Sequence, residues 1–457
     1  MHGTIVQLVG FNPAARTAAD SKPTLRHGQA LPGCMRTRRS TMLAAQRLML
    51  FPGKTGFLVS YRVVSELVGK GSTFILIILT ARLLTKEEFA VLSLAYATGW
   101  ILSVVSDFGM QIYLAREVAK APGFALQILR ALLYRRVQLS ALLFLGLLAF
   151  SLATGWPAFR TAFLLVVLAQ VLGSLIDFLC HFLRGVSRSD VESSFTLAYR
   201  PASLLVVAAC LAAGGKLTSV AIALATASLL GLLMILRVSW RIGQHGEAVA
   251  AASPVLLKER LAGLREFLPI GVGIVLSALY FRADLYLIEW WRGLEAVALY
   301  NAVFRLIDAS RLLPAALLAV IFPRLCRETT TRAAIRYGFL LVSAGLILAL
   351  GIRLASSWIV TLAYGRDYLA AVPAFDILLW GLPLFYLNYL LTHQLIAWNL
   401  QSYFAVLCGS GLVVNLCLNV VLIPRIGIEG AALSTVLTEV FLTAGWVLVL
   451  RGRRRRK

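Results

Sequence analysis

Charged residues are scarce in this sequence, and acidic residues are the scarcest. Only 14% of the 457 residues are charged, with 21 acidic residues against 44 lysines and arginines, whereas 59% are hydrophobic. A soluble protein of ordinary composition has about a quarter charged residues. This deficit, with a mean hydropathy of +0.82, argues against a soluble enzyme or binding domain and predicts an integral membrane protein.

The residues that build metal sites and disulfides are also few. The sequence has six cysteines and five histidines, scattered along the chain, and no CxxC pair. We therefore expect no metal site, no structural disulfide and no bound cofactor. No HExxH pattern or nucleophile–base pair stands out in the predicted outer loops, which are short, so we predict no catalytic residues and no enzymatic activity.

Apolar stretches long enough to cross a bilayer fill the chain from about Phe57 to Leu450. A membrane helix needs about 20 mostly apolar residues. The predicted spans are 57–82, 89–110, 137–155, 161–183, 193–213, 217–237, 267–290, 297–322, 337–359, 370–396, 403–423 and 430–450. The predicted fold class is an all-α polytopic membrane protein with about twelve transmembrane helices.

The predicted organisation has two halves of six helices each. A basic amphipathic linker, 241–266, separates an N-terminal bundle at 57–240 from a C-terminal bundle at 267–450. We expect residues 1–56 to be a disordered basic extension and residues 451–457 to be a basic tail.

Basic residues cluster in alternate loops. One group holds Arg130, Arg135 and Arg136, and a later group holds Lys258 and Arg260, whereas the loops between such groups carry few cations. This alternation places the basic loops and both termini in the cytoplasm. It also explains the net charge of +23 without nucleic-acid binding. Leucines between the cations in 111–138 and 240–266 predict surface helices at lipid headgroups.

The two halves resemble each other weakly. Residues 86–96 (KEEFAVLSLAY) and 294–304 (LEAVALYNAVF) each follow an odd-numbered span, with an acid near the start and an aromatic residue deeper in the helix. Transporters commonly consist of paired repeats with the binding site between them. The repeat therefore favours a transport site between the halves.

Several segments, taken in order and spacing, are similar to one transporter family. They are ARLLTKEEFAVLSLAYA (81–97), VSDFGMQIYLARE (105–117), FRADLYLIEWWRGLEAVALYNAVFRLIDASRLLPAALLAVIFPRL (281–325), YGRDYLAAVPAFDILLWGLPL (364–384) and PRIGIEGAALSTVLTEV (424–440). Together they resemble the oligosaccharide flippase (Wzx-type) branch of the multidrug/oligosaccharidyl-lipid/polysaccharide exporter superfamily. The family usually has glycine where Ala90 and Ala298 stand, so the chain diverges at both positions.

The resemblance implies two six-helix bundles around a central cavity in the bacterial inner membrane. It implies that the protein flips a polyprenyl-diphosphate-linked oligosaccharide to the outer leaflet for O-antigen, capsule or exopolysaccharide synthesis. An H+ or Na+ gradient would drive alternating access. The implied partners are the lipid-linked oligosaccharide, membrane lipids, and a polysaccharide polymerase with its chain-length machinery.

Ionisable residues within the spans are the candidate site. An anionic diphosphate loses hydration inside the membrane, and fixed arginines offset that cost with paired hydrogen bonds. Arg305 and Arg311 are the strongest candidates because Asp308, which lies between them, can pair well with only one. The other substrate-binding candidates are Arg282, Arg62, Lys70 and Arg200. Asp308 and Asp284 are candidates for ion coupling, since access to solvent can change the charge of a buried carboxylate.

Each candidate charge also has a structural interpretation, as a partner in an ion pair. Two other functions remain open. A multidrug exporter of the same superfamily would carry organic cations and should have acids in its cavity, and a membrane polysaccharide polymerase or ligase should have larger outer loops. The peptidoglycan-precursor branch of the superfamily usually has more than twelve spans.

Overall fold

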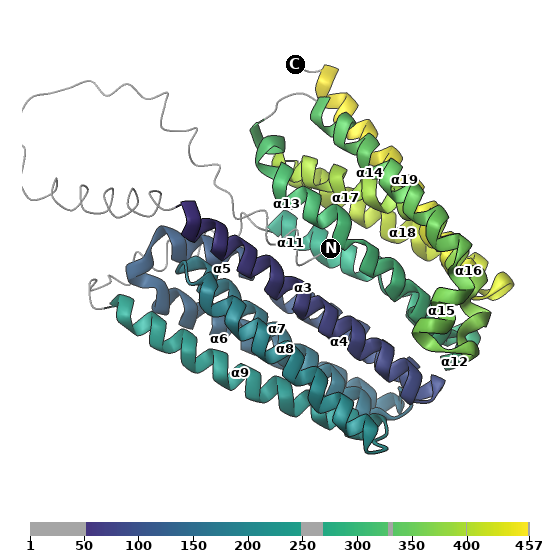
Figure 1. Cartoon of the computed structure of the whole chain (residues 1–457), viewed down its shortest axis with the longest axis horizontal. Helices are drawn as coiled ribbons and strands as arrows, with labels where there is room; N and C mark the ends of the chain where they lie inside the picture. The colour runs from purple at the N-terminus through teal and green to yellow at the C-terminus, as the bar shows by residue number, and fades with distance from the viewer. Residues whose placement is uncertain (1–51, 248–267, 328–331, 399, 456–457) are drawn as a thin grey trace, which may run out of the picture.

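The computed structural model describes residues 52–247, 268–327, 332–398 and 400–455, and all regular secondary structure there is helical. Two lobes are visible in Figure 1. The N-lobe contains α3 (Pro52–Leu83), α4 (Lys86–Asp107), α5 (Met110–Lys120), η1 (Pro122–Phe124), α6 (Ala125–Thr154), α7 (Arg160–Gly185), α8 (Ser189–Ala212) and α9 (Leu217–Glu247).

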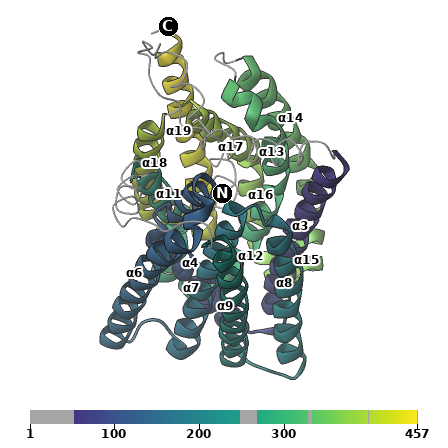
Figure 2. The same ribbon diagram turned by 90° about the vertical axis from the view of Figure 1, so that its left-hand side faces the viewer.

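The C-lobe packs beside it, as the end-on view of Figure 2 also shows. Its elements are α11 (Leu268–Tyr280), α12 (Ala283–Ser310), α13 (Leu312–Arg327), α14 (Arg332–Leu354), α15 (Ser356–Tyr364), η3 (Arg366–Ala371), α16 (Val372–Trp380), α17 (Leu382–Ala397), α18 (Gln401–Ile426) and α19 (Ile428–Arg455).

The number of membrane crossings agrees with the sequence. Ten helical stretches of the described chain are long and apolar enough to span a bilayer, and the bent pair Arg366–Trp380 and Leu382–Ala397 makes eleven. One of the ten doubles back at the kink of Gly293 (φ 79°, ψ −179°), and Tyr300 on the second leg donates a hydrogen bond of 2.7 Å to Asp284 on the first. Counting the two legs separately gives twelve crossings, as predicted. All of these segments are helical, which confirms the predicted all-α class.

Four predicted spans are interrupted rather than continuous, and two of them, 337–359 and 370–396, break between α14 and α15 and between α16 and α17. The span predicted at 267–290 breaks between α11 and α12, and the span at 297–322 breaks between α12 and α13. Pro314 explains the break between α12 and α13, because it has no N–H to donate to the carbonyl of Ser310 one turn earlier. The hydroxyl of Tyr386 donates to that carbonyl instead, at 2.7 Å.

Residues 111–138 do not form the predicted surface helix. α6 begins at Ala125 and runs into the bundle, so Leu126 and Leu129 are fully buried. Arg136 is also buried, with its Nη1 2.6 Å from Oδ1 of Asp107. A leucine stripe facing a bundle and one facing lipid headgroups have the same spacing, which is why the prediction failed.

The predicted boundaries differ from the helix ends in two places. α3 begins at Pro52, within the predicted extension 1–56, whose residues 1–51 lie outside the described chain. α9 continues to Glu247, past the start of the predicted linker 241–266, and the rest of that linker lies outside the described residues.

The two repeat segments meet at one end of the molecule. Ser93 and Asn301 are the eighth residues of the two segments, and the Asn301 amide donates to the Ser93 hydroxyl at 2.7 Å, where both are buried. Lys86 and Glu295 form an ion pair of 2.6 Å nearby. These contacts hold the lobes together at that end, whereas the lobes lie apart where α3 begins and α19 ends (Figure 1).

Candidate substrate cavity

Two adjoining cavities of about 430 and 650 Å3 lie between the lobes. Both are lined by Lys70, Gln170, Arg200, Arg305 and Asp308. These side chains come from α3, α7 and α8 of the N-lobe and from α12 of the C-lobe. The volumes lie within the range of about 300–1,000 Å3 that is typical of small-molecule sites.

The C-lobe wall, which we define as Arg282, Arg305, Asp308 and Arg311, surrounds the break between α12 and α13. Asp308 lies between two arginines, 3.4 Å from Arg282 and 3.5 Å from Arg311. Of the two arginines that flank Asp308 in the sequence, only Arg311 pairs with it, as expected, and the hairpin at Gly293 brings a third arginine, Arg282, to its other oxygen. Three arginines still face one carboxylate on this wall.

Aromatic rings hold two of these arginines in place. The Arg311 guanidinium lies 4.6 Å from the ring centre of Phe281 and 5.0 Å from that of Phe385. The Arg282 guanidinium lies 5.7 Å from the ring of Trp100, which belongs to the other lobe. Such contacts favour a cation at these positions and limit its movement.

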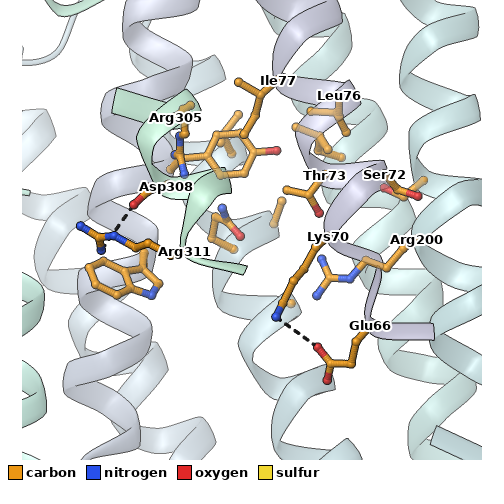
Figure 3. A pocket seen from close by; sticks show the side chains of 18 of the residues that line it. Glu66, Lys70, Ser72, Thr73, Leu76, Ile77, Arg200, Arg305, Asp308 and Arg311 are labelled. Atoms are coloured by element: carbon orange, nitrogen blue, oxygen red, sulfur yellow. Dashed lines mark ion pairs between the residues drawn. The ribbon is translucent and has the colours of Figure 1, made fainter. Parts of the chain in front are cut away.

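Arg305 is the cation without a partner. Within the described part of the chain it makes no hydrogen bond or ion pair, and its Nε atom is buried. Figure 3 shows its side chain beside Asp308 in the cavity. Because an arginine has five N–H donors, Arg305 can bind an anion without first breaking a protein contact.

The N-lobe wall, which we define as Tyr96, Trp100, Gln170, Tyr199, Arg200, Ser203, Ser228 and the α3 residues Glu66 and Lys70, faces it across the cavity. Its cations are paired. Lys70 lies 3.6 Å from Glu66, and Arg200 lies 3.5 Å from Asp177. The N-lobe wall therefore has little surplus charge, in contrast to the C-lobe wall (Figure 3).

Arg62 and Asp284 are not among the cavity-lining residues. Arg62 lies one turn before Glu66 on α3. Asp284 is 3% exposed and accepts hydrogen bonds from the Tyr300 hydroxyl and the Leu285 amide. A second buried carboxylate of the C-lobe, Glu439, accepts from Tyr280 at 2.6 Å and from Asn388 at 2.6 Å.

Sequence reasoning did not identify the neutral residues of the N-lobe wall. Gln170, Tyr96 and Ser203 are ordinary residues on apolar helices, and only the arrangement of α4, α7 and α8 brings them together.

The part of the chain that the structure describes contains no cluster of three histidine, cysteine, aspartate or glutamate side chains able to hold a metal ion.

A comparison with protein families decides the family. The profile of the polysaccharide biosynthesis protein family matches residues 59–329. The chain belongs to this family. No curated protein matches the sequence significantly.

Solved structures of a flippase and of transporters are similar to this chain in fold. The lipid II flippase MurJ in an inward closed conformation is 14% identical, with a TM-score of 0.61 over 86% of this chain and 87% of that one. An inward-facing multidrug resistance MATE transporter of the MOP superfamily is 12% identical, with a TM-score of 0.67 over 87% and 98%. A MOP-superfamily transporter from Pyrococcus furiosus is 13% identical, with a TM-score of 0.60 over 87% and 95%. The fold is thus the two-lobe helical bundle of this superfamily.

Proposed function

We propose that this protein flips a polyprenyl-diphosphate-linked oligosaccharide from the cytoplasmic to the outer leaflet of the bacterial inner membrane, for O-antigen, capsule or exopolysaccharide synthesis. The observation that carries the proposal is the charge of the cavity. Five cations and two carboxylates line the smaller cavity, and Arg305 has no partner among the described residues. The family match and the fold of flippases and transporters support the same proposal.

The charge argues against the multidrug-exporter alternative. An organic cation entering the cavity would meet the arginines of the C-lobe wall, with Asp308 already shared between Arg282 and Arg311. A diphosphate would meet three arginines that can each offer paired N–H donors to its oxygens. We therefore assign the diphosphate to Arg305 and Arg311, with Arg282 beside them.

The contacts between the lobes suggest how the cavity alternates. The Lys86–Glu295 and Ser93–Asn301 contacts close one end, and Arg82 donates from α3 to the carbonyl of Ala363 in α15 at 2.8 Å. With both termini in the cytoplasm, the open end faces the cytoplasm, so the substrate enters there. Breaking these contacts while the opposite ends of the lobes approach each other would expose the cavity to the outer leaflet.

Ion coupling is the remaining part of the proposal. Asp308 lies in the cavity between two arginines, so a change in its charge would release or recapture the groups that hold the diphosphate. Asp284 is buried outside the cavity. A change in its charge would alter its hydrogen bond with Tyr300 on the returning leg of α12. We propose an H+ or Na+ gradient as the driving force, and a polysaccharide polymerase with its chain-length machinery as the consumer of the product.

Complementation of a deletion strain tests this function. We expect the strain to accumulate a completed lipid-linked oligosaccharide and to lose surface polysaccharide, and the wild-type gene to restore both. The Arg305→Gln/Arg311→Gln variant should fail to restore export, whereas Arg353→Gln, an exposed arginine outside the cavity, should restore it.

Other outcomes would contradict the proposal. Full export by the double variant, inserted at normal levels, would remove the arginines from the site. Single units that reach the outer leaflet but are not joined would indicate a polymerase, and finished polymer left on lipid would indicate a ligase. Altered sensitivity to cationic drugs without any lipid-linked intermediate would favour the multidrug exporter.

A further inference from the structure

The two walls of the cavity differ in the kind of polar group that they leave free. On the C-lobe wall the free groups are cationic, because Arg282 and Arg311 share one carboxylate, Asp308, and Arg305 has no partner among the described residues. On the N-lobe wall the charges are matched in pairs, Lys70 with Glu66 and Arg200 with Asp177. The larger cavity continues this pattern, since Arg184 there is paired with Glu192.

The free groups of the N-lobe wall are neutral. Tyr96, Trp100, Gln170 and Ser203 all line the smaller cavity. Their side-chain polar groups make no hydrogen bond to another described residue. Together they offer donors and acceptors beside aromatic faces, which is the combination that a neutral polyhydroxylated ligand requires.

Packing of the N-lobe holds this wall in place. A Cβ atom on Gly99 would lie only 2.6 Å from the Cβ of Gln170, so the glycine allows α7 to approach α4 closely and places Gln170 beside Trp100. The ring of Tyr199 is stacked on Phe195 with centres 5.3 Å apart, and its hydroxyl donates to Ser228 at 3.3 Å. The polar groups are therefore carried by packed helices rather than by loops.

We propose that the N-lobe wall is the sugar-binding half of the cavity, where Tyr96, Gln170 and Ser203 hydrogen-bond to the first sugars of the glycan while the diphosphate lies on the C-lobe wall. This proposal rests on the proposed function, because it divides one substrate between the two walls. It implies that the sugars next to the diphosphate are neutral, since the N-lobe wall has no surplus charge to match an acidic sugar. It also implies that recognition of the glycan and of the diphosphate can be separated by mutation.

Binding of two probes, one with and one without sugars, tests whether the N-lobe wall binds the sugars and the C-lobe wall binds the diphosphate. The full-length protein in nanodiscs would be titrated with bare undecaprenyl diphosphate and with the lipid-linked glycan that accumulates in the deletion strain. We expect Tyr96→Phe and Gln170→Leu each to weaken binding of the glycan-bearing lipid about fivefold, since a neutral hydrogen bond contributes about 1 kcal/mol. Binding of bare undecaprenyl diphosphate should stay unchanged, which also shows that the variants are folded. Tyr134→Phe, which changes an exposed tyrosine outside the cavity, is the matched control for Tyr96→Phe.

The outcomes separate this inference from the proposed function. Equal losses for both probes, or no loss for either, would overturn the sugar-binding wall while leaving the flippase assignment intact. Failure of the wild-type protein to bind bare undecaprenyl diphosphate would overturn the proposed function, and this division of the substrate with it.

Discussion

Arg305→Gln and Asp308→Asn change the charge of the same cavity by one unit in opposite directions, and we predict opposite effects on diphosphate affinity. Arg305 has no protein partner among the described residues, so its loss removes a charged hydrogen bond to the ligand and little else. Such a bond contributes about 1.5–3 kcal/mol, which corresponds to roughly 10- to 150-fold weaker binding.

The Asp308→Asn variant should bind the diphosphate more tightly. Asp308 lies 3.4 and 3.5 Å from its two arginines, so a phosphate on the far side of either arginine would be roughly 7 Å from the carboxylate. At that distance two unit negative charges repel each other by about 2 kcal/mol with an effective dielectric constant near 20. Removing the repulsion should raise the affinity about 30-fold, and asparagine keeps the shape of the side chain.

Titration of the nanodisc-embedded protein with undecaprenyl diphosphate measures both changes. The effects should shrink as salt concentration rises, because they are electrostatic, and Arg353→Gln should leave the affinity unchanged. Weaker binding by Asp308→Asn would refute the reasoning, since it would show that the carboxylate mainly positions the arginines. We also expect this variant to turn over more slowly than the wild type, because a tighter complex releases its substrate less readily.

Three further predictions concern other parts of the molecule. Asp107→Ala should destabilise the N-lobe by about 3–5 kcal/mol, since it leaves Arg136 buried without its partner, and thermal unfolding should recover most of the loss in the Asp107→Ala/Arg136→Leu double variant. Gly430→Ala should lower the thermal midpoint, because the added Cβ would lie 2.5 Å from the carbonyl oxygen of Leu422, and a midpoint equal to that of the wild type would contradict the close packing of α18 and α19. Asp284→Asn should leave diphosphate binding unchanged, as Asp284 lies outside the cavity, but should reduce the dependence of transport on the ion gradient, and unaltered gradient dependence would exclude Asp284 from coupling.

The sequence predicts the fold well because membrane helices are specified by local composition. Stretches of about 20 apolar residues are visible without any tertiary information. The contact between the repeat segments, Ser93 with Asn301, becomes visible only in the structure. Breaks within spans are harder to predict. Pro314 marks one break, but no proline or glycine marks the break at Phe281 and Arg282.

The candidate site could be predicted only in part. Arginines within apolar spans are conspicuous, so Arg282, Arg305 and Arg311 could be found from the sequence. Their pairing could not, because it depends on the hairpin at Gly293 that brings Arg282 to Asp308. The neutral N-lobe wall has no local pattern at all, since a glutamine or serine on an apolar helix looks the same whether it faces a cavity or a neighbouring helix.

Transbilayer movement of the lipid-linked glycan in vesicles is the measurement that bears on the flippase function with the fewest intervening steps. Purified protein would be reconstituted into proteoliposomes with the lipid-linked glycan from the deletion strain, and the fraction in each leaflet would be followed by accessibility of the glycan to an added glycosidase. The proposed flippase function predicts rapid movement with the wild-type protein and with Arg353→Gln, and little movement with Arg305→Gln/Arg311→Gln. Movement no faster than in protein-free vesicles, by a folded wild-type protein supplied with H+ and Na+ gradients, would contradict it.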